Sequence, residues 1–119
     1  MTRAKTLGNY GESLAAEYLR RHGYEVIHNN YRSGRLELDL VARKGRQTIF
    51  FEVKTISQNQ DSRGEIPLTS RQISNLKRGL SAYCIKNRID LDAVRLDLLI
   101  VSVDRENKSV RFKQYRDIF

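Results

Sequence analysis

The sequence predicts an α/β domain in which helices flank a mixed sheet of about five strands, in the order α-β-β-β-α-β-β. Two segments carry apolar residues at helical spacing, and the segments between and after them alternate in polarity or are rich in β-branched residues. A chain of 119 residues is large enough for one hydrophobic core and too small for two. We therefore expect residues 1–119 to form a single domain.

The first helix is expected over Lys5–His22, with Gly23 placed to cap its C-terminus. Glu12 lies on the border of the apolar face, at about 100° per residue around the helix. Its carboxylate therefore either turns out to water or faces the sheet. The apolar face itself comprises Leu7, Tyr10, Gly11, Leu14, Ala15, Tyr18 and Leu19.

A strand and a hairpin are expected next. Tyr24–Tyr31 has the pattern of a strand, and a turn at Ser33-Gly34 separates it from a hairpin over Leu36–Thr55. The hairpin turn is expected at Gly45-Arg46, because glycine as the first central residue suits a type II′ turn. The apolar positions expected to share one face of the first arm are Leu36, Leu38, Leu40 and Ala42.

Ile56–Pro67 is polar and lacks periodicity, which predicts a long loop. Thr69 or Ser70 then caps a second helix that runs to about Asn87. Lys77 projects from its apolar face, where a lysine either extends its ammonium group to the rim or serves a site. That face comprises Ile73, Leu76, Leu80, Tyr83 and Cys84, the last expected as a small core residue.

The C-terminal part predicts two further strands. Val94–Val103 is nearly continuous in apolar residues, which is typical of a central strand covered on both faces. Asp104–Asn107 is expected to turn the chain, and Val110–Tyr115 to form a strand at the edge of the sheet.

The register of the predicted hairpin places like charges together. Any even-length loop centred on its turn sets Asp39 opposite Glu52, and Glu37 opposite Lys54. Carboxylates directly opposite each other on a ladder repel, so something must offset that cost. A divalent cation is one explanation. The other is a surface salt-bridge ladder, which accounts for Glu37 and Lys54 better than for the two carboxylates.

A phosphodiester-cleaving site would use these residue types. Mg²⁺ prefers hard oxygen ligands, which Asp39, Glu52 and the backbone carbonyl of Val53 supply. One or two Mg²⁺ or Mn²⁺ ions can activate water and neutralise charge at phosphorus. Lys54, on the same strand face as Glu52, can orient the water or stabilise developing negative charge. Glu12 adds a third carboxylate if its helix packs beside the hairpin.

The net charge of +8 indicates an anionic partner, and nucleic acid is the commonest. No helix-turn-helix, zinc-finger or RNA-binding signature is present, so phosphate contacts are expected rather than base readout. His22 and His28 lack metal-ligand spacing. The residues expected to contact nucleic acid are Arg32, Arg43, Lys44, Arg46, Arg71, Lys77 and Arg78.

The sequence also indicates where in the cell the protein is expected. No apolar run reaches the roughly 18 residues of a membrane span, so no membrane partner is expected. The N-terminus lacks the apolar stretch of a signal peptide, and the one cysteine suits a reducing compartment. We therefore expect a cytoplasmic protein.

Glu12, Glu37-Leu38-Asp39 and Glu52-Val53-Lys54 resemble the motif of the PD-(D/E)xK nuclease superfamily, in its Holliday-junction-resolvase-like branch. The chain resembles more closely the YraN-like family of small bacterial proteins. This resemblance runs nearly from end to end. The matching segments are Gly8–Glu12, Ala15–Leu19, Gly23-Tyr24, Asn30–Arg32, Leu36–Val41, Phe51–Thr55, Lys77, Arg95–Asp97 and Phe119.

The resemblance implies a restriction-endonuclease-like core. It assigns metal binding to Asp39 and Glu52, catalysis to Lys54, and a helix-borne acidic role to Glu12. Two positions depart from the pattern: the proline of the motif name is absent, and Leu36 stands where relatives tend to carry glycine. Neither departure removes a chemical group of the site.

Three functions follow from these observations. The leading one is a metal-dependent endonuclease that hydrolyses branched or otherwise structured DNA. The alternatives are a non-catalytic nucleic-acid-binding module on the same scaffold, and an assembly factor without a nucleic-acid partner. Because branched DNA has two-fold character, we also expect a homodimer, formed through the C-terminal edge strand or the second helix.

Overall fold

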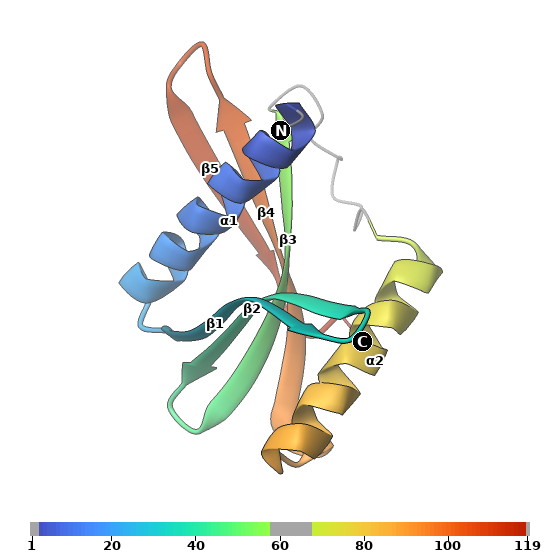
Figure 1. Ribbon diagram of the computed structural model, residues 1–119. Helices are drawn as coiled ribbons and strands as arrows, with labels where there is room; N and C mark the ends of the chain where they lie inside the picture. Colours follow the sequence, from blue (N-terminus) through green and yellow to red (C-terminus); the bar gives the residue numbers. More distant parts are fainter. Residues whose placement is uncertain (1–2, 58–67, 119) are drawn as a thin grey trace.

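The computed structural model describes residues 3–57 and 68–118. A five-stranded sheet forms its centre, with one helix against each face (Figure 1). The sequence predicted this architecture and element order correctly. The elements are α1 (Arg3–Arg21), β1 (Glu25–Ser33), β2 (Leu36–Lys44), β3 (Gln47–Ser57), α2 (Ser70–Asn87), a short 3₁₀ helix (Leu91–Ala93), β4 (Val94–Asp104) and β5 (Ser109–Tyr115).

The strands lie in sequence order from β1 to β5. All neighbouring pairs are antiparallel except β3 and β4, which run parallel because α2 carries the chain back between them. The sheet is therefore mixed. β4 lies between two partners and β5 forms an edge, as their sequences predicted.

Two apolar clusters hold the helices on the sheet. Ala15, Ala16 and Leu19 of α1 pack on the face that presents Phe51 and Leu99. On the opposite face, a cluster joins α2 to strands β2, β3 and β4. Its buried members are Leu38, Val41, Phe50, Leu76, Leu80, Tyr83, Cys84 and Leu96. Cys84 is a core residue, as expected.

The helix ends follow their sequence signals. Gly23 adopts a φ of 88° just after α1, a conformation that glycine accepts without steric cost. Thr69 caps α2, and its hydroxyl oxygen accepts from the Gln72 amide at 3.1 Å. The Gln72 side-chain oxygen accepts in turn from the Thr69 amide at 2.8 Å, which completes a capping box.

The turns differ slightly from expectation. The β2–β3 turn lies at Gly45-Arg46, between paired Lys44 and Gln47, as predicted. The β1–β2 turn falls one residue later than predicted, at Gly34-Arg35. β3 extends to Ser57, beyond the predicted loop start, and residues 58–67 of that loop lie outside the described residues.

The predicted hairpin register is right near the turn and wrong beyond it. The β2–β3 ladder ends at the pair Leu40–Phe51. Past that point β2 pairs with β1 alone, so Glu37 lies beside Arg32 rather than Lys54. The Arg32 and Glu37 side chains form an exposed ion pair of 3.6 Å. The split opens a gap in the sheet at Asp39.

The direction of β2 also changes at this point. Leu40 and Ala42 pack on the α1 side, whereas Leu38 packs on the α2 side, so the predicted shared face of these residues is wrong. Asn30, between the positions of β1 that pair with Leu38 and Leu40, has a left-handed φ of 52°. The β1–β2 ribbon therefore bends at the Asn30–Asp39 position.

Candidate active site

Asp39 fills the gap where β2 leaves β3. Its Oδ2 accepts a hydrogen bond of 2.8 Å from the backbone amide of Val53. This bond satisfies an amide that the ladder no longer pairs, because the last β2–β3 pair is Leu40–Phe51. The carboxylate is therefore held against β3, beside Glu52.

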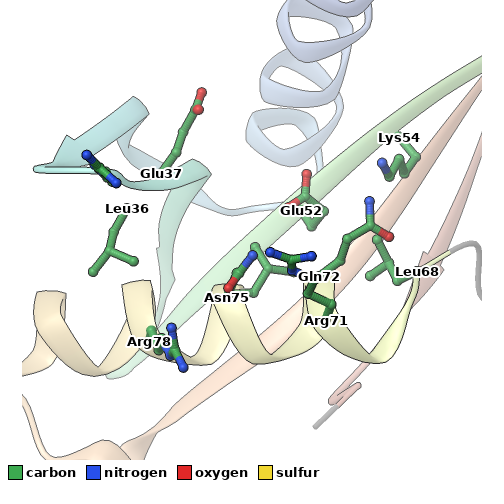
Figure 2. Close-up of a pocket in the computed structure, with 11 residues that line it drawn as sticks. Leu36, Glu37, Glu52, Lys54, Leu68, Arg71, Gln72, Asn75 and Arg78 are labelled. Carbon is green, nitrogen blue, oxygen red and sulfur yellow. The ribbon is translucent and has the colours of Figure 1, made fainter.

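Glu52 and Lys54 come from β3 and line a cleft together with residues of α2 (Figure 2). Burial raises the pKa of Glu52 to about 9, assisted by the hydrogen bond and the charge of Asp39. The Lys54 ammonium opposes this rise, which places Lys54 close enough to act on the same carboxylate. The predicted trio of Asp39, Glu52 and Lys54 is therefore one group in space.

Glu12 reaches the same group from the α1 side. Burial raises its pKa to about 7, and the neighbouring charge of Asp39 adds to the rise. The side chain of Asn30 hydrogen-bonds Glu12 and opposes the shift. Asp39 is within hydrogen-bonding reach of both Glu12 and Glu52, so it stands between them.

Gly11 explains how Glu12 comes so close. A Cβ at Gly11 would overlap Thr55 Oγ1 and stand 2.7 Å from Thr55 Cβ, so α1 rests directly on β3 at this residue. Only glycine fits such a contact without displacing the helix. The next residue in the chain is Glu12, whose position therefore depends on this contact.

A cleft of about 530 Å³ opens beside Glu52 and Lys54. The β1–β2 turn and the N-terminal half of α2 form its other walls (Figure 2). Four cationic side chains face two carboxylates there, so the cleft is suited to an anion. The lining residues are Arg35, Leu36, Glu37, Glu52, Lys54, Leu68, Arg71, Gln72, Asn75, Leu76 and Arg78.

Sequence reasoning missed three polar residues of this cleft: Arg35, Gln72 and Asn75. Arg35 enters from the β1–β2 turn, whose position the sequence placed one residue too early. The helical spacing of Arg71, Asn75 and Arg78 puts them on one side of α2, which is a signal that the sequence does contain.

The predicted nucleic-acid contacts do not all lie at the cleft. Arg71 and Arg78 line it, whereas exposed Lys77 does not. Arg43 and Lys44 are near the β2–β3 turn, where Arg43 lies 3.7 Å from a Glu25 carboxylate oxygen and Lys44 covers the Tyr24 ring. Exposed Arg46 is in that turn, and Arg32 pairs with Glu37 on the β1–β2 ribbon.

The carboxylates suit a small hard cation. Asp39 and Glu52 supply oxygen ligands from adjacent strands, which matches Mg²⁺, whose remaining positions are usually filled by water and phosphate. Over the described ranges, no group of three or more His, Cys, Asp or Glu side chains is placed to hold a metal by itself. A cation here would therefore depend on water or a bound phosphate to complete its coordination.

The fold and the site define a small α/β protein with a carboxylate–lysine group at a split between two strands. The chain belongs to the uncharacterised protein family UPF0102, whose sequence model matches residues 11–101. This confirms the predicted family. The matched segment contains all four residues of the candidate active site: Glu12, Asp39, Glu52 and Lys54.

Two relatives and one solved structure illustrate what the chain is similar to. A UPF0102 protein of Bacteroides thetaiotaomicron is 35% identical over 119 residues, covering 100% of this chain and 96% of that protein. One of Geobacter metallireducens is 35% identical over 99 residues, covering 82% and 80%. The solved structure of Hjc, a Holliday junction resolvase from Archaeoglobus fulgidus, is similar with 19% identity and a TM-score of 0.47, covering 89% and 75%.

The helices of the described residues show no membrane-spanning character. Neither combines the length and the apolar composition needed to cross a bilayer.

Proposed function

We propose that this protein is a Mg²⁺-dependent endonuclease that hydrolyses phosphodiester bonds in branched or otherwise structured DNA. One observation carries the proposal: Glu52 and Lys54 line a cleft whose other walls carry Arg35 and Arg71, and Asp39 lies next to Glu52. Hard oxygen ligands, a cation on the same strand and guanidinium groups nearby are the parts that phosphodiester hydrolysis requires.

Each residue has a role in this proposal. Asp39 and Glu52 hold the cation, which when bound supplies charge neutralisation at the phosphate and an activated water. The Lys54 ammonium orients that water or stabilises the charge that develops on the phosphate oxygens. Glu12 lies beside Asp39 and fixes its orientation. The predicted role of Glu12 as a third metal ligand is not supported, because the three carboxylates are not placed to hold one ion together.

The reaction is a simple hydrolysis. The water oxygen forms a bond to phosphorus as the ester P–O bond breaks. One proton of the water passes to the leaving oxygen, which becomes a hydroxyl group, and the other remains with the phosphate or is released to solvent. The arginines of the cleft hold the phosphates in place and carry no proton in this scheme.

The choice of structured DNA rests on two supports. The cleft offers cations for phosphate groups, which favours contacts with the nucleic-acid backbone. The sequence resemblance adds the preference for branched substrates. A homodimer, which would match a two-fold junction, stays a prediction that sedimentation at micromolar concentration will test.

Cleavage of a labelled four-way junction in Mg²⁺ or Mn²⁺ tests the proposal. We expect Asp39→Asn, Glu52→Gln and Lys54→Ala each to lower the rate by about 10²–10³-fold. Glu106→Gln, which removes an exposed carboxylate in the β4–β5 turn, is the matched control and should cleave normally. A parent protein that binds junctions but cleaves none of them with either metal would instead favour the non-catalytic binding module.

A further inference from the structure

A second cavity lies on the α1 side of the sheet, opposite the cationic cleft. Its volume is about 400 Å³, within the usual range for small-ligand sites. Helix α1 and strand β1 form its walls. The polar residues that line it are Asn9, Glu12, Ser13, Arg20, Asn29 and Asn30.

This cavity and the cleft are lined by neighbouring carboxylates that interact through Asp39. Glu12 lines the α1-side cavity and interacts electrostatically with Asp39 and Glu52. Glu52 and Lys54 line the cleft on the α2 side. Asp39 lies in the gap between β2 and β3 and interacts with Glu12 of one cavity and Glu52 of the other. A phosphate over Asp39 is therefore next to a residue of each cavity.

The two cavities differ in charge. The cleft presents several guanidinium groups, whereas the α1-side cavity carries one cation, Arg20, and one carboxylate, Glu12. The rest of its polar lining is amide and hydroxyl. A phosphate placed there would meet one cation, Arg20, whose attraction the Glu12 carboxylate opposes. Uncharged groups with both donors and acceptors face no such penalty.

The amides and hydroxyl suit a nucleoside. An asparagine side chain offers two donors and an acceptor, a combination that matches the Watson–Crick edge of a nucleobase. The Ser13 hydroxyl donates to the Asn9 carbonyl at 3.1 Å, which leaves its oxygen free to accept from a ligand. Asn30 is already turned toward Glu12, so Asn29 has the freer amide of the two.

We propose that the α1-side cavity binds the base and sugar of the nucleotide next to the phosphate held over Asp39, in a strand where that base is unpaired. The base must be unpaired because pairing in a duplex occupies the edge that the asparagines would contact. This inference rests on the proposed function, since it places the phosphate at the carboxylates. It adds a subsite with a preference for single-stranded or branch-point nucleotides.

Binding without divalent cations tests the subsite while hydrolysis is prevented. Fluorescence anisotropy would compare a labelled single-stranded oligodeoxynucleotide with the duplex of the same sequence. We expect Asn29→Ala to weaken single-strand binding by about three- to tenfold and to leave duplex binding unchanged. Asn107→Ala, which removes an exposed asparagine in the β4–β5 turn, is the matched control and should change neither. An equal loss for both DNAs, or no loss, overturns the inference.

A second experiment tests the subsite in the parent protein, without a substitution. The side-chain amide signals of Asn29 and Asn9 in a ¹H–¹⁵N NMR spectrum should shift with a deoxynucleoside monophosphate and stay in place with inorganic phosphate. Equal shifts with phosphate alone, or shifts confined to Gln72 and Asn75 in the cleft, contradict the subsite. A parent protein that cleaves no DNA would remove the endonuclease proposal, while selective shifts in this cavity would still support a nucleoside site.

Discussion

Replacing Gly11 with alanine tests whether the contact between α1 and β3 positions the site. The new Cβ would lie 2.7 Å from Thr55 Cβ and 2.8 Å from its Cγ2. Because carbon atoms pack at about 3.5–4.0 Å, the helix must retreat by roughly 1 Å. Thr55 is β-branched and anchored in β3, so it yields little. Such overpacking costs about 1–3 kcal/mol.

Gly79 in α2 provides the matched control. A Cβ at Gly79 would meet Leu38 at 3.4 Å, an ordinary van der Waals distance. Both alanines gain the same helix propensity, about 1 kcal/mol over glycine. That gain cancels in the comparison, so Gly11→Ala should be less stable than Gly79→Ala by about 1–3 kcal/mol.

Urea denaturation of the two variants measures this difference, provided that both keep the m-value of the parent protein. Adding Thr55→Gly should relieve the clash and give a favourable coupling with Gly11→Ala in a double-mutant cycle. Gly11→Ala should also lose cleavage activity, because Glu12 moves away with the helix. Equal stabilities for the two alanine variants, with no coupling to Thr55, would refute the contact.

Three further predictions concern charge. Without divalent cations, the raised pKa of Glu52 makes the folded protein hold a proton that the unfolded chain releases, so stability falls as pH rises from about 4.5 toward 9. Glu52→Gln should flatten this fall and be more stable than the parent protein at pH 8 by about 1–3 kcal/mol. Urea denaturation in the presence of EDTA measures both effects. Asp97→Asn should destabilise the fold by about 3–5 kcal/mol in the same assay, since it breaks the ion pair between partly exposed Arg95 and a fully buried carboxylate. Arg71→Gln should lower the salt-dependence slope of DNA binding by about 1, whereas Arg105→Gln, in the exposed β4–β5 turn, should leave it unchanged. The first prediction is contradicted if the stability difference between Glu52→Gln and the parent protein does not change with pH. The second is contradicted if Asp97→Asn is as stable as the parent, and the third if the two arginine variants have equal salt slopes.

The fold was predictable because its local signals agree with its packing. The capping residue Thr69, the apolar face of α2 and the glycine turn at Gly45 each act within a few residues of chain. The continuous apolar run of β4 likewise predicted a strand buried on both faces. Local propensity and burial point to the same structure in each of these segments.

The break in the hairpin was not predictable from alternation. The pattern from Leu36 to Ala42 implies one continuous face, yet Leu38 packs toward Gly79 of α2 while Leu40 packs toward α1. The position of a helix that is distant in sequence decides where β2 leaves β3. Asn30 has the left-handed φ at the bend, and asparagine accepts this conformation more readily than most residues, but its presence in a sequence does not predict it.

The site was predictable in its carboxylates and less so in its surroundings. The register of the hairpin ends at Leu40–Phe51, one position before Asp39 and Glu52, and so predicts that these two carboxylates are neighbours. The border position of Glu12 follows from helix geometry. Outside the site, the hydrogen bonds of Asp97 combine a neighbour in sequence, Arg95, with two distant donors: the Gln114 amide at 2.8 Å and the Asp117 backbone at 2.9 Å. Only the tertiary fold brings those donors together around one buried carboxylate.

The central claim is that Asp39 and Glu52 bind a divalent cation beside Lys54. Anomalous diffraction from a crystal soaked in Mn²⁺ measures this directly. The proposal predicts one peak or two within about 2.2 Å of carboxylate oxygens of both residues, lost in the Asp39→Asn variant. A crystal that takes up Mn²⁺ elsewhere, with both carboxylates ordered and no peak between them, would contradict it.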